Sequence, residues 1–282
     1  MTIRTSLAVT MLLCAACGDD TATGGGATGG NAPLGGGGEA AAGAPAGGAG
    51  GEPAGGEGPT GGNGGAAAQE AIVFVRGTLF TDDMAEAQAA HDAVASGGEA
   101  AAIAAGDIAH DTFLGVPLLG TTANQFQAFD RWANDENLDA FYADPNFQAA
   151  FGSLFSAPPQ LESFAPADGW YGWGSLDAAD ATEPHYIVVV RGTLAGTPEE
   201  VQAQHDPIAS GGEAAASALG DVAHVAYLGR EDDHEVLFVD VWTSDDAIEA
   251  FYGNPDFQAA FSTLFAAPPD VAVFESNDWH QW

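Results

Sequence analysis

Beyond residue 70, the pattern of apolar and polar positions runs through one order of elements twice. Residues 72–79 and 187–194 are dense in branched apolar side chains, which predicts a largely buried strand at the start of each half. Three more strands are expected in each half. These further strands are expected at 107–114, 125–132, 161–164, 221–228, 235–242 and 271–274.

A helix is expected between the first and second strands of each half. In the second half it begins at residues 197–200, where Thr-Pro-Glu-Glu forms a capping box with proline in the first turn. Ser-Gly-Gly-Glu at 96–99 and 210–213 carries the same capping signal, so we expect a separate short helix to start there. Gly106 and Gly220 are expected to end it.

A second helical segment precedes the last strand of each half. Its apolar residues recur at helical spacing, and Asp144-Pro145 predicts a break with a new helix start. The apolar positions in the first half are Leu138, Phe141, Phe147, Phe151, Leu154 and Phe155. We therefore expect a kinked helix in this part of each half.

The two halves are copies of one unit. Residues 96–110 return at 210–224 with twelve of fifteen positions identical, too close a match for chance in a non-repetitive string. The first repeat is placed at 70–173 and the second at 185–282, joined by an acidic, flexible linker at 174–184. Each repeat ends in Trp-x-x-Trp, with tryptophans at Trp170, Trp173, Trp279 and Trp282.

The order strand, helix, strand, strand, helix, strand predicts an α+β fold of ferredoxin-like type. Such a unit has helices on one face of its sheet only, so the other face needs a cover. A second copy in the same chain supplies one. We therefore expect two βαββαβ repeats packed sheet to sheet as an intramolecular α/β barrel, a pseudo-dimer that is monomeric as a chain. An apolar pocket is expected between the repeats.

Two matching segments resemble the dimeric α/β-barrel superfamily, notably the antibiotic biosynthesis monooxygenase-like proteins. They are residues 130–151, beginning Asp-Arg-Trp, and residues 240–261, beginning Asp-Val-Trp. The resemblance implies a cofactor-independent monooxygenase acting on an aromatic substrate. It also implies haem as an alternative cofactor, because haem-binding proteins share the superfamily. That family commonly has a histidine in the helix after the third strand, where this chain has Phe-Tyr at 141–142 and 251–252, and this departure counts against an enzyme.

Composition narrows the classes of partner. The formal net charge is −35, with 40 acidic and 5 basic residues and no lysine. Nucleic acids and anionic lipid surfaces attract proteins through lysine and arginine, so neither is expected as an electrostatic partner. Both cysteines lie before residue 18, so the folded repeats have no thiol for a disulfide or a metal.

The N-terminal region predicts where in the cell the protein is located. Residues 1–16 carry one arginine and a short apolar run, as in a secretory signal, and Cys14-Ala-Ala-Cys17 resembles a bacterial lipoprotein signal with Cys17 as the lipid acceptor. Residues 17–69 are rich in glycine and alanine and predict a disordered tether. We therefore expect a lipid-anchored protein of the bacterial cell envelope, at the outer membrane or the periplasmic face.

Four histidines are matched between the repeats. His91 and His205 lie on the apolar face of the first helix of each repeat, which is compatible with a hydrogen-bonded core histidine or with a pocket residue. If haem were bound, these two residues with His110 and His224 would be its candidate ligands.

A row of polar side chains is expected across the sheet of each repeat. With a suitable register, Arg76, Asp130 and His110 share a row in the first repeat, and the second repeat has Arg191, Asp240 and His224. An aspartate between an arginine and a histidine would orient the imidazole for acid-base work. The alternative is a structural ion pair beside an uninvolved histidine.

Trp132 and Trp242, with the terminal tryptophans, are candidates to line an apolar ligand pocket, or else they fill the core. Sequence motifs for zinc proteases, phosphate-binding loops and serine hydrolases do not occur, and no metal site is expected. The favoured function is binding of a small apolar or aromatic ligand. The alternatives are a monooxygenase and a haem-binding protein, and the question of catalysis stays open.

Overall fold

A computed structural model describes residues 70–180 and 185–282. The predicted signal at 1–16, the predicted lipid acceptor Cys17 and the predicted tether at 17–69 lie outside the described residues.

Each repeat contains the predicted strands in the predicted order, with helical segments after its first and third strands. The elements of the first repeat are β1 (Ala71–Thr78), α1 (Met84–Ala105), β2 (Asp107–Gly115), β3 (Gln125–Trp132), α2 (Leu138–Tyr142), α3 (Pro145–Gly152) and β4 (Gln160–Pro166). Those of the second repeat are β5 (Tyr186–Thr193), α4 (Pro198–Leu219), β6 (Asp221–Gly229), β7 (Glu235–Trp242), α5 (Asp245–Tyr252), α6 (Pro255–Phe261), the 3-10 turn η2 (Ser262–Leu264) and β8 (Asp270–Ser276).

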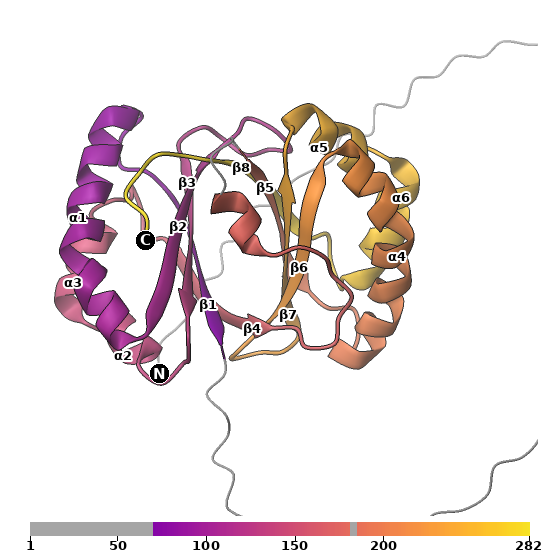
Figure 1. The fold of residues 1–282 in the computed structure, drawn as a ribbon, viewed down its shortest axis with the longest axis horizontal. Helices are drawn as coiled ribbons and strands as arrows, with labels where there is room; N and C mark the ends of the chain where they lie inside the picture. Colours follow the sequence, from indigo (N-terminus) through magenta and orange to yellow (C-terminus); the bar gives the residue numbers. More distant parts are fainter. Residues whose placement is uncertain (1–69, 181–184) are drawn as a thin grey trace, which may run out of the picture. The chain divides into compact units, whose positions relative to one another are not determined.

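The strands of the described residues form one closed antiparallel barrel in the order β1-β3-β2-β8-β5-β7-β6-β4. Each repeat contributes four neighbouring strands, with its last strand beside its first, as in a ferredoxin-like sheet. The two sheets are joined at their edges by hydrogen bonding of β2 to β8 and of β4 to β6. Closure removes every free sheet edge, which is the usual solution to edge exposure in β-proteins. The expected intramolecular α/β barrel is confirmed (Figure 1).

Side chains fill the barrel interior. Its core includes Phe74, Phe129, Phe164 and Phe274, with Phe74 in edge-to-face contact with Phe129 at 6.0 Å between ring centroids. Branched residues of β5 and β7, such as Val189 and Val239, are fully buried among them. The expected pocket between the two repeats is therefore wrong, because large rings from both sheets occupy that space.

Helices cover the outside of the barrel, α1, α2 and α3 on the first sheet and α4, α5 and α6 on the second (Figure 1). Each helical layer packs on the outward face of its own sheet and forms a separate apolar cluster. None of the helices in 70–180 and 185–282 combines the length and apolarity that a membrane crossing requires.

The expected second helix start at Ser-Gly-Gly-Glu is wrong, because α1 and α4 run through it as single helices of 22 residues. The Ser96 hydroxyl donates to the carbonyl of Asp92, one turn earlier, instead of capping a new helix. The predicted ends are confirmed. Gly106 and Gly220 take positive φ angles of 118° and 109°, which glycine adopts without strain.

The predicted break before Pro145 is confirmed, and it separates α2 from α3. The Asp144 side chain accepts from the backbone N–H groups of Asn146 and Phe147, and Asn254 caps α6 in the same way. The linker at 174–184 is not simply flexible. Residues Leu176–Asp180 form a 3-10 turn, η1, whose Leu176 and Ala179 side chains are buried in the barrel core.

Candidate functional site

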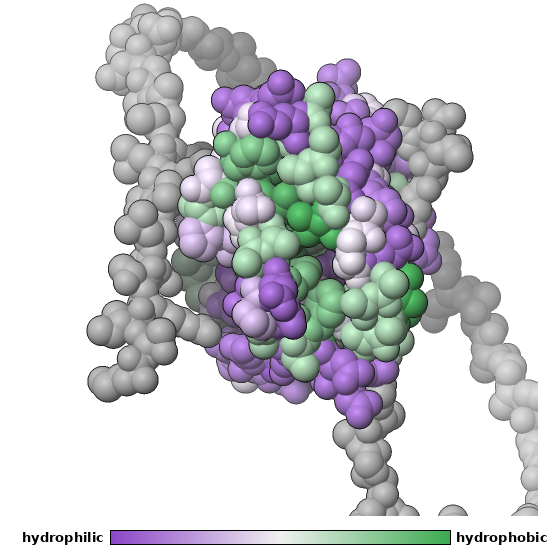
Figure 2. Space-filling view, turned by 90° about the vertical axis from the view of Figure 1, so that its left-hand side faces the viewer, coloured by the Kyte–Doolittle hydropathy of each residue, from purple (hydrophilic) through white to green (hydrophobic). Residues whose placement is uncertain are grey.

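Each repeat has a pocket between its helices and the outward face of its sheet. The pocket of the first repeat encloses a cavity of about 40 Å³ and that of the second about 30 Å³. In Figure 2, the helical side of the first repeat shows hydrophobic surface around a hollow, bordered by hydrophilic residues. The first pocket is lined by His91, Val94, Ala95, Gly98, Ala102, Asp107, His110, Asp130, Phe141, Phe147, Phe151, Leu154 and Trp282.

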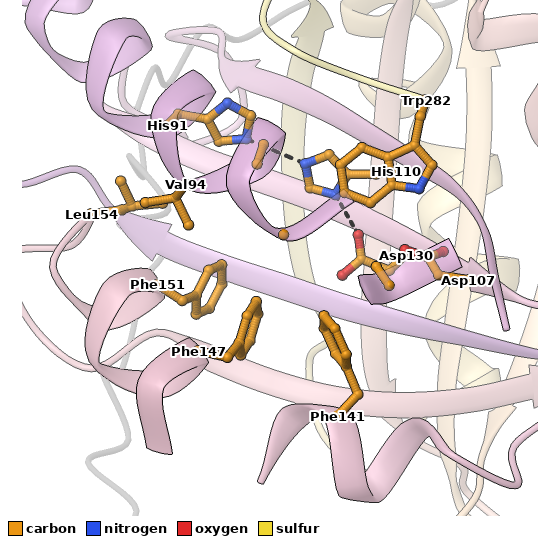
Figure 3. Close-up of a pocket in the computed structure, with 13 residues that line it drawn as sticks. His91, Val94, Asp107, His110, Asp130, Phe141, Phe147, Phe151, Leu154 and Trp282 are labelled. Carbon is orange, nitrogen blue, oxygen red and sulfur yellow. Dashed lines mark hydrogen bonds and ion pairs between the residues drawn. The ribbon is translucent and has the colours of Figure 1, made fainter. Parts of the chain in front are cut away.

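A row of hydrogen-bonded polar side chains forms one wall of the first pocket (Figure 3). His91 Nε2 on α1 lies 3.2 Å from His110 Nε2 on β2, and His110 Nδ1 lies 2.5 Å from Asp130 Oδ1 on β3. The Tyr142 hydroxyl, from α2, donates to the other oxygen of Asp130. At the outer end, His91 Nδ1 is 3.1 Å from Asp92 Oδ1. The row runs from a partly exposed carboxylate to a buried one.

The two imidazoles meet edge to edge. Their centroids are 5.5 Å apart and their planes differ by 11°, while the facing Nε2 atoms are only 3.2 Å apart, so the rings do not overlap. This is the geometry of an N–H···N hydrogen bond. The Nε2 atom of each ring is therefore engaged in a hydrogen bond with the other ring.

All ring nitrogens of the two imidazoles take part in contacts. The contacts Asp92–His91, His91–His110 and His110–Asp130 each need one proton, and two neutral imidazoles carry only two. Burial is the main reason that the pKa of His91 is lowered to about 4, and the neighbouring His110 adds to this. One further proton is therefore shared along the row, and both ring nitrogens of His110 are engaged.

The second repeat builds the same row. His205 Nε2 lies 3.0 Å from His224 Nε2, His224 Nδ1 contacts Asp240, and the Tyr252 hydroxyl donates to Asp240. Burial again lowers the pKa of the helix histidine, His205. The chain thus carries two equivalent candidate sites.

The tail of each repeat covers the pocket of the other repeat. After β8, Trp282 stacks on His110 at 4.5 Å between centroids, and Trp279 lies against His91 at 5.1 Å. After β4, Trp173 and Trp170 take the same places over the histidines of the second repeat. The Trp-x-x-Trp sequences are therefore exchanged caps, and neither pocket is complete without the other repeat.

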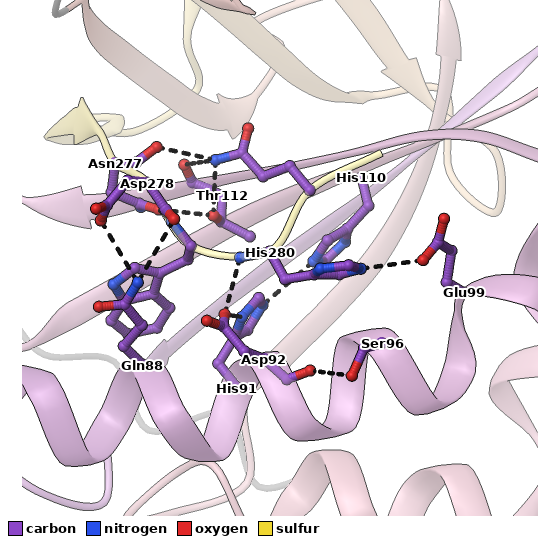
Figure 4. Close-up of polar contacts among 12 residues, drawn as sticks. Gln88, His91, Asp92, Ser96, Glu99, His110, Thr112, Asn277, Asp278 and His280 are labelled. Carbon is purple, nitrogen blue, oxygen red and sulfur yellow. Dashed lines mark hydrogen bonds and ion pairs between the residues drawn. The ribbon is translucent and has the colours of Figure 1, made fainter.

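Polar contacts hold the exchanged tail of the second repeat to α1 (Figure 4). The backbone N–H of His280 donates to Asp92 Oδ1 at 2.8 Å, and His280 Nε2 lies 3.1 Å from Glu99 Oε2. In the other repeat the N–H of Tyr171 donates to Asp206 at 2.9 Å, and its hydroxyl donates to Glu213. Glu99 and Glu213 of the repeated Ser-Gly-Gly-Glu thus fasten the tails.

A second buried carboxyl faces each pocket. Asp107 is 3% exposed, and burial together with the negative charge of Asp130 raises its pKa to about 8. In the second repeat, burial and Asp240 raise the pKa of Asp221 to about 9. Each pocket therefore pairs a buried carboxyl that contacts histidine and tyrosine with a second carboxyl that is mostly protonated at neutral pH.

Folding stability is expected to decrease as the pH rises from about 6.5 to about 8. The folded-state pKa of Asp107 is raised above its usual 3.8, so its contribution is complete below pH 3.8 and is lost as pH rises through about 8. The pKa of His91 is lowered from 6.5 to about 4, so this residue changes stability only between these pH values. It does not contribute to the pH dependence of stability above pH 6.5. Each raised carboxyl contributes on the order of 1 kcal/mol per pH unit.

Urea unfolding at several pH values tests this expectation. The matched control is the double variant Asp107→Asn Asp221→Asn, whose stability should be nearly flat over the same range. A wild-type curve that is already flat between pH 6.5 and 8 would show that these carboxyls do not keep their protons.

The structure brings together only two of the three residues in each predicted row. Asp130 stands opposite His110, and Asp240 opposite His224. The expected place of the arginines is wrong, because Asp130 faces Val73 on β1 while Arg76 lies three residues further and on the interior face. Arg76 contacts Gln127 at 3.2 Å and pairs with Asp270 of the second repeat.

Arg191 likewise leaves its predicted row. It pairs with Glu162 of the first repeat at 2.6 Å, so the two arginines tie each sheet to the last strand of the other. Trp132 and Trp242 are fully buried beneath the pockets and do not line them. Of the predicted tryptophans, the terminal Trp282 and Trp173 line the pockets instead.

Residues 187–263, from β5 to η2, match the family model described as antibiotic biosynthesis monooxygenase. The matched residues make up most of the second repeat. The first repeat has the same elements in the same order, so the resemblance expected from the sequence is confirmed for the fold. No curated protein matches the chain.

Solved structures of monooxygenase-like proteins share the barrel. An anthrone oxidase-like protein is 18% identical with a TM-score of 0.53, and the match covers 77% of this chain and 94% of that one. A putative monooxygenase from Fusobacterium nucleatum is 9% identical with a TM-score of 0.51, covering 77% and 98%. At these identities the similarity establishes the fold alone.

The two pockets do not fit haem as they stand. The Nε2 atoms of His91 and His110 face each other, and the cavity of about 40 Å³ is far smaller than a porphyrin. Away from the pockets, the exposed residues Asp232, Asp233 and His234 bring ligand atoms within 4.8 Å of one another. Exposed acidic turns of this kind are common without a metal.

Several residues of the site had no distinctive sequence signal. Tyr142 and Tyr252 looked like apolar helix positions, and Asp107 and Asp221 looked like the first residues of strands. Their only sequence signal is that each is repeated at the matching position of the other half. The repetition singled out Asp107 as part of the duplicated segment 96–110, but it did not predict which face of the sheet the side chain of Asp107 would occupy.

Proposed function

We propose that this protein binds a small, planar aromatic molecule in each of its two pockets and oxygenates it with dioxygen, without a cofactor. The observation that carries the proposal is the pairing, in each pocket, of an aromatic wall with a buried acid-base row. The monooxygenase-type domain and the shared barrel support it.

The aromatic wall suits a flat ligand. Phe141, Phe147 and Phe151 project from α2 and α3 toward the pocket, opposite the polar row (Figure 3). The rings of Phe147 and Phe151 are nearly parallel, 5.2 Å apart with an angle of 12°. An aromatic ligand would pack on these faces and gain area burial and ring contacts.

The polar wall suits removal of a proton from such a ligand. Loss of a proton from an activated methylene leaves an electron pair spread over the aromatic rings, and that electron-rich anion can reduce dioxygen. In the full reaction the methylene loses two hydrogens and becomes a carbonyl, and the second oxygen atom leaves as water. The protein supplies position, a dry environment and a base.

A ligand of this size needs the exchanged tail to move. The enclosed cavity has room for water but not for a fused ring, and the indole of Trp282 already covers His110. A bound aromatic molecule would take the place of this indole, so Trp282 and Trp173 compete with ligands for their pockets.

Replacing Trp282 with alanine is expected to strengthen binding of 1-naphthol at the first pocket by about two- to tenfold. A stack of this kind contributes about 0.5–1.5 kcal/mol, which the ligand no longer has to displace. Isothermal titration measures it, and Trp173→Ala is the matched control because it should affect only the second pocket. Unchanged or weaker binding in both variants would contradict the competition.

Oxygen consumption tests the proposed activity. Purified residues 70–282 would be mixed with a panel of anthrones and quinols, and uptake above the rate in buffer is expected for at least one member. No uptake across the panel, together with no binding of 1-naphthol, would overturn the proposal.

Ligand binding without oxygenation is the second candidate. It is favoured by Tyr142, which stands in the helix after the third strand where the resembled family commonly has a histidine, and which is engaged with Asp130. Binding of 1-naphthol with no oxygen uptake would select this candidate.

We further propose that the two pockets work on a monomeric chain held at the bacterial cell envelope by lipid on Cys17. The support is the sequence of residues 1–69. Growth with labelled palmitate should label the wild type and not Cys17→Ser, and a label retained by the variant would contradict this anchor.

A further inference from the structure

Both ring nitrogens of His110 already have partners, so this histidine is poorly placed to take a proton from a ligand. Nδ1 contacts Asp130 at 2.5 Å and Nε2 contacts His91 at 3.2 Å, so both nitrogens are engaged within the row. His224 is engaged in the same way by Asp240 and His205. The base of each pocket therefore has to be another group.

A β-bulge turns Asp107 into the pocket. His110 pairs with Asp130 and Ala109 with Arg131, yet Asp107, not Ile108, stands opposite Trp132. Because side chains alternate along a strand, Asp107 would face the barrel interior without this extra residue. The bulge instead places Asp107 on the same face as His110.

The bulge has the same form in the second repeat. Asp221 stands opposite Trp242, Ala223 opposite Val241, and Val222 is the displaced residue. The displaced residues are exposed, Ile108 by 55% and Val222 by 38%. At both sites the bulge exposes an apolar side chain to solvent and buries a carboxyl. Both changes cost stability, so packing alone does not favour this arrangement.

Asp107 stands outside the histidine row. Its Oδ1 accepts from the backbone N–H of Ala109 at 3.3 Å, which fixes the carboxyl across the bulge. It lines the apolar pocket together with the aromatic wall. The groups that act on it are Asp130 from β3, Asp111 from β2, Tyr142 from α2 and Trp282 from the tail, while α1 contributes His91 and otherwise uncharged residues to this pocket.

The surroundings make Asp107 a stronger base than an ordinary carboxylate. Asp130 contacts His110 and accepts from Tyr142, and its negative charge raises the pKa of the buried Asp107. The resulting pKa of about 8 means that a minor fraction is ionised at pH 7, and that this fraction binds a proton firmly.

We propose that Asp107, and Asp221 in the second repeat, is the base that removes the proton from the bound ligand. This rests on the proposed function of the pockets. The ligand C–H bond breaks, an O–H bond forms on the aspartate, and the electron pair stays on the ligand. The histidine row holds Asp130 in place, and the charge of Asp130 in turn raises the pKa of Asp107.

Exchange of hydrogen for deuterium isolates this step from oxygenation. Anthrone in D₂O without oxygen exchanges its methylene hydrogens when they are removed and replaced, and mass spectrometry follows the label. Wild-type protein is expected to accelerate the exchange over buffer, and Asp107→Asn Asp221→Asn to lose about 100-fold of that acceleration. Asparagine keeps the shape and neutrality of a protonated aspartate but cannot accept the proton.

Single variants provide matched controls within one chain. Asp107→Asn and Asp221→Asn should each leave about half of the wild-type exchange rate at high pH. The wild-type rate should rise with pH through about 8 and 9, and Asp130→Asn should move the lower midpoint to lower pH. A structural role for Asp107 would not give this shift.

The outcomes separate the two proposals. Accelerated exchange without oxygen uptake would reject oxygenation and support the aspartates. Oxygen uptake with exchange unaffected in the double variant would reject the aspartates and leave the oxygenase standing. Loss of exchange in His110→Asn His224→Asn but not in the aspartate variant would make the histidines the base. No exchange and no uptake by wild type would overturn both.

Discussion

Replacing Asp130 with alanine is expected to lower the free energy of unfolding by about 3–5 kcal/mol. Asp130 is 6% exposed, and it accepts from His110 Nδ1 and from the Tyr142 hydroxyl. Without it, the Nδ1 atom of His110 and the hydroxyl of Tyr142 remain buried without their partner. A buried group left without its partner costs far more than an exposed ion pair contributes.

Urea unfolding at pH 7 measures this loss. Asp240→Ala removes the matching carboxylate of the second repeat and should cost a similar amount, whereas the exposed Glu249→Ala should stay within about 0.5 kcal/mol of wild type. A loss below about 1 kcal/mol for Asp130→Ala would mean that the hydrogen bonds of this buried row contribute little to stability.

The second repeat alone, residues 185–282, is expected to show no folded monomer. Separation would expose the interior face of its sheet, including Ile187, Val189, Leu237 and Val239, all fully buried in the barrel. Each such side chain contributes about 1.5–3 kcal/mol by burial, so four of them match the whole stability of a typical domain. The edges β6 and β8 would also lose β4 and β2.

The fragment should instead pair with a second copy of itself. Its β8 edge and tail carry the same elements that β4 and the first tail present to it in the whole chain. Light scattering should give the mass of a dimer or of larger aggregates, with residues 70–282 as the control. A folded monomer of the fragment would show that the shared interior is not needed for stability.

Local patterns were enough to predict much of each repeat. Runs dense in branched apolar residues predicted the first strand of each repeat close to its observed bounds, because a largely buried strand is apolar along its own sequence. The pairing of His110 with Asp130 also followed, since both sit on antiparallel neighbours within one repeat. The Ser-Gly-Gly signal misled because a long helix packed along its length can continue through residues that favour a new start.

The sequence by itself determined the duplication, the element order and hence the need for two sheets to cover each other. Only the tertiary structure decided which edges join, which tail covers which pocket and which carboxyl faces the pocket. Trp282 contacts His110, which lies more than a hundred residues earlier in the sequence. One extra residue in β2 turns the side chain of Asp107 from the barrel interior to the outer face of the sheet. Neither leaves a trace in the apolar pattern, because contacts between distant segments and a one-residue bulge are set by the packing of the whole barrel.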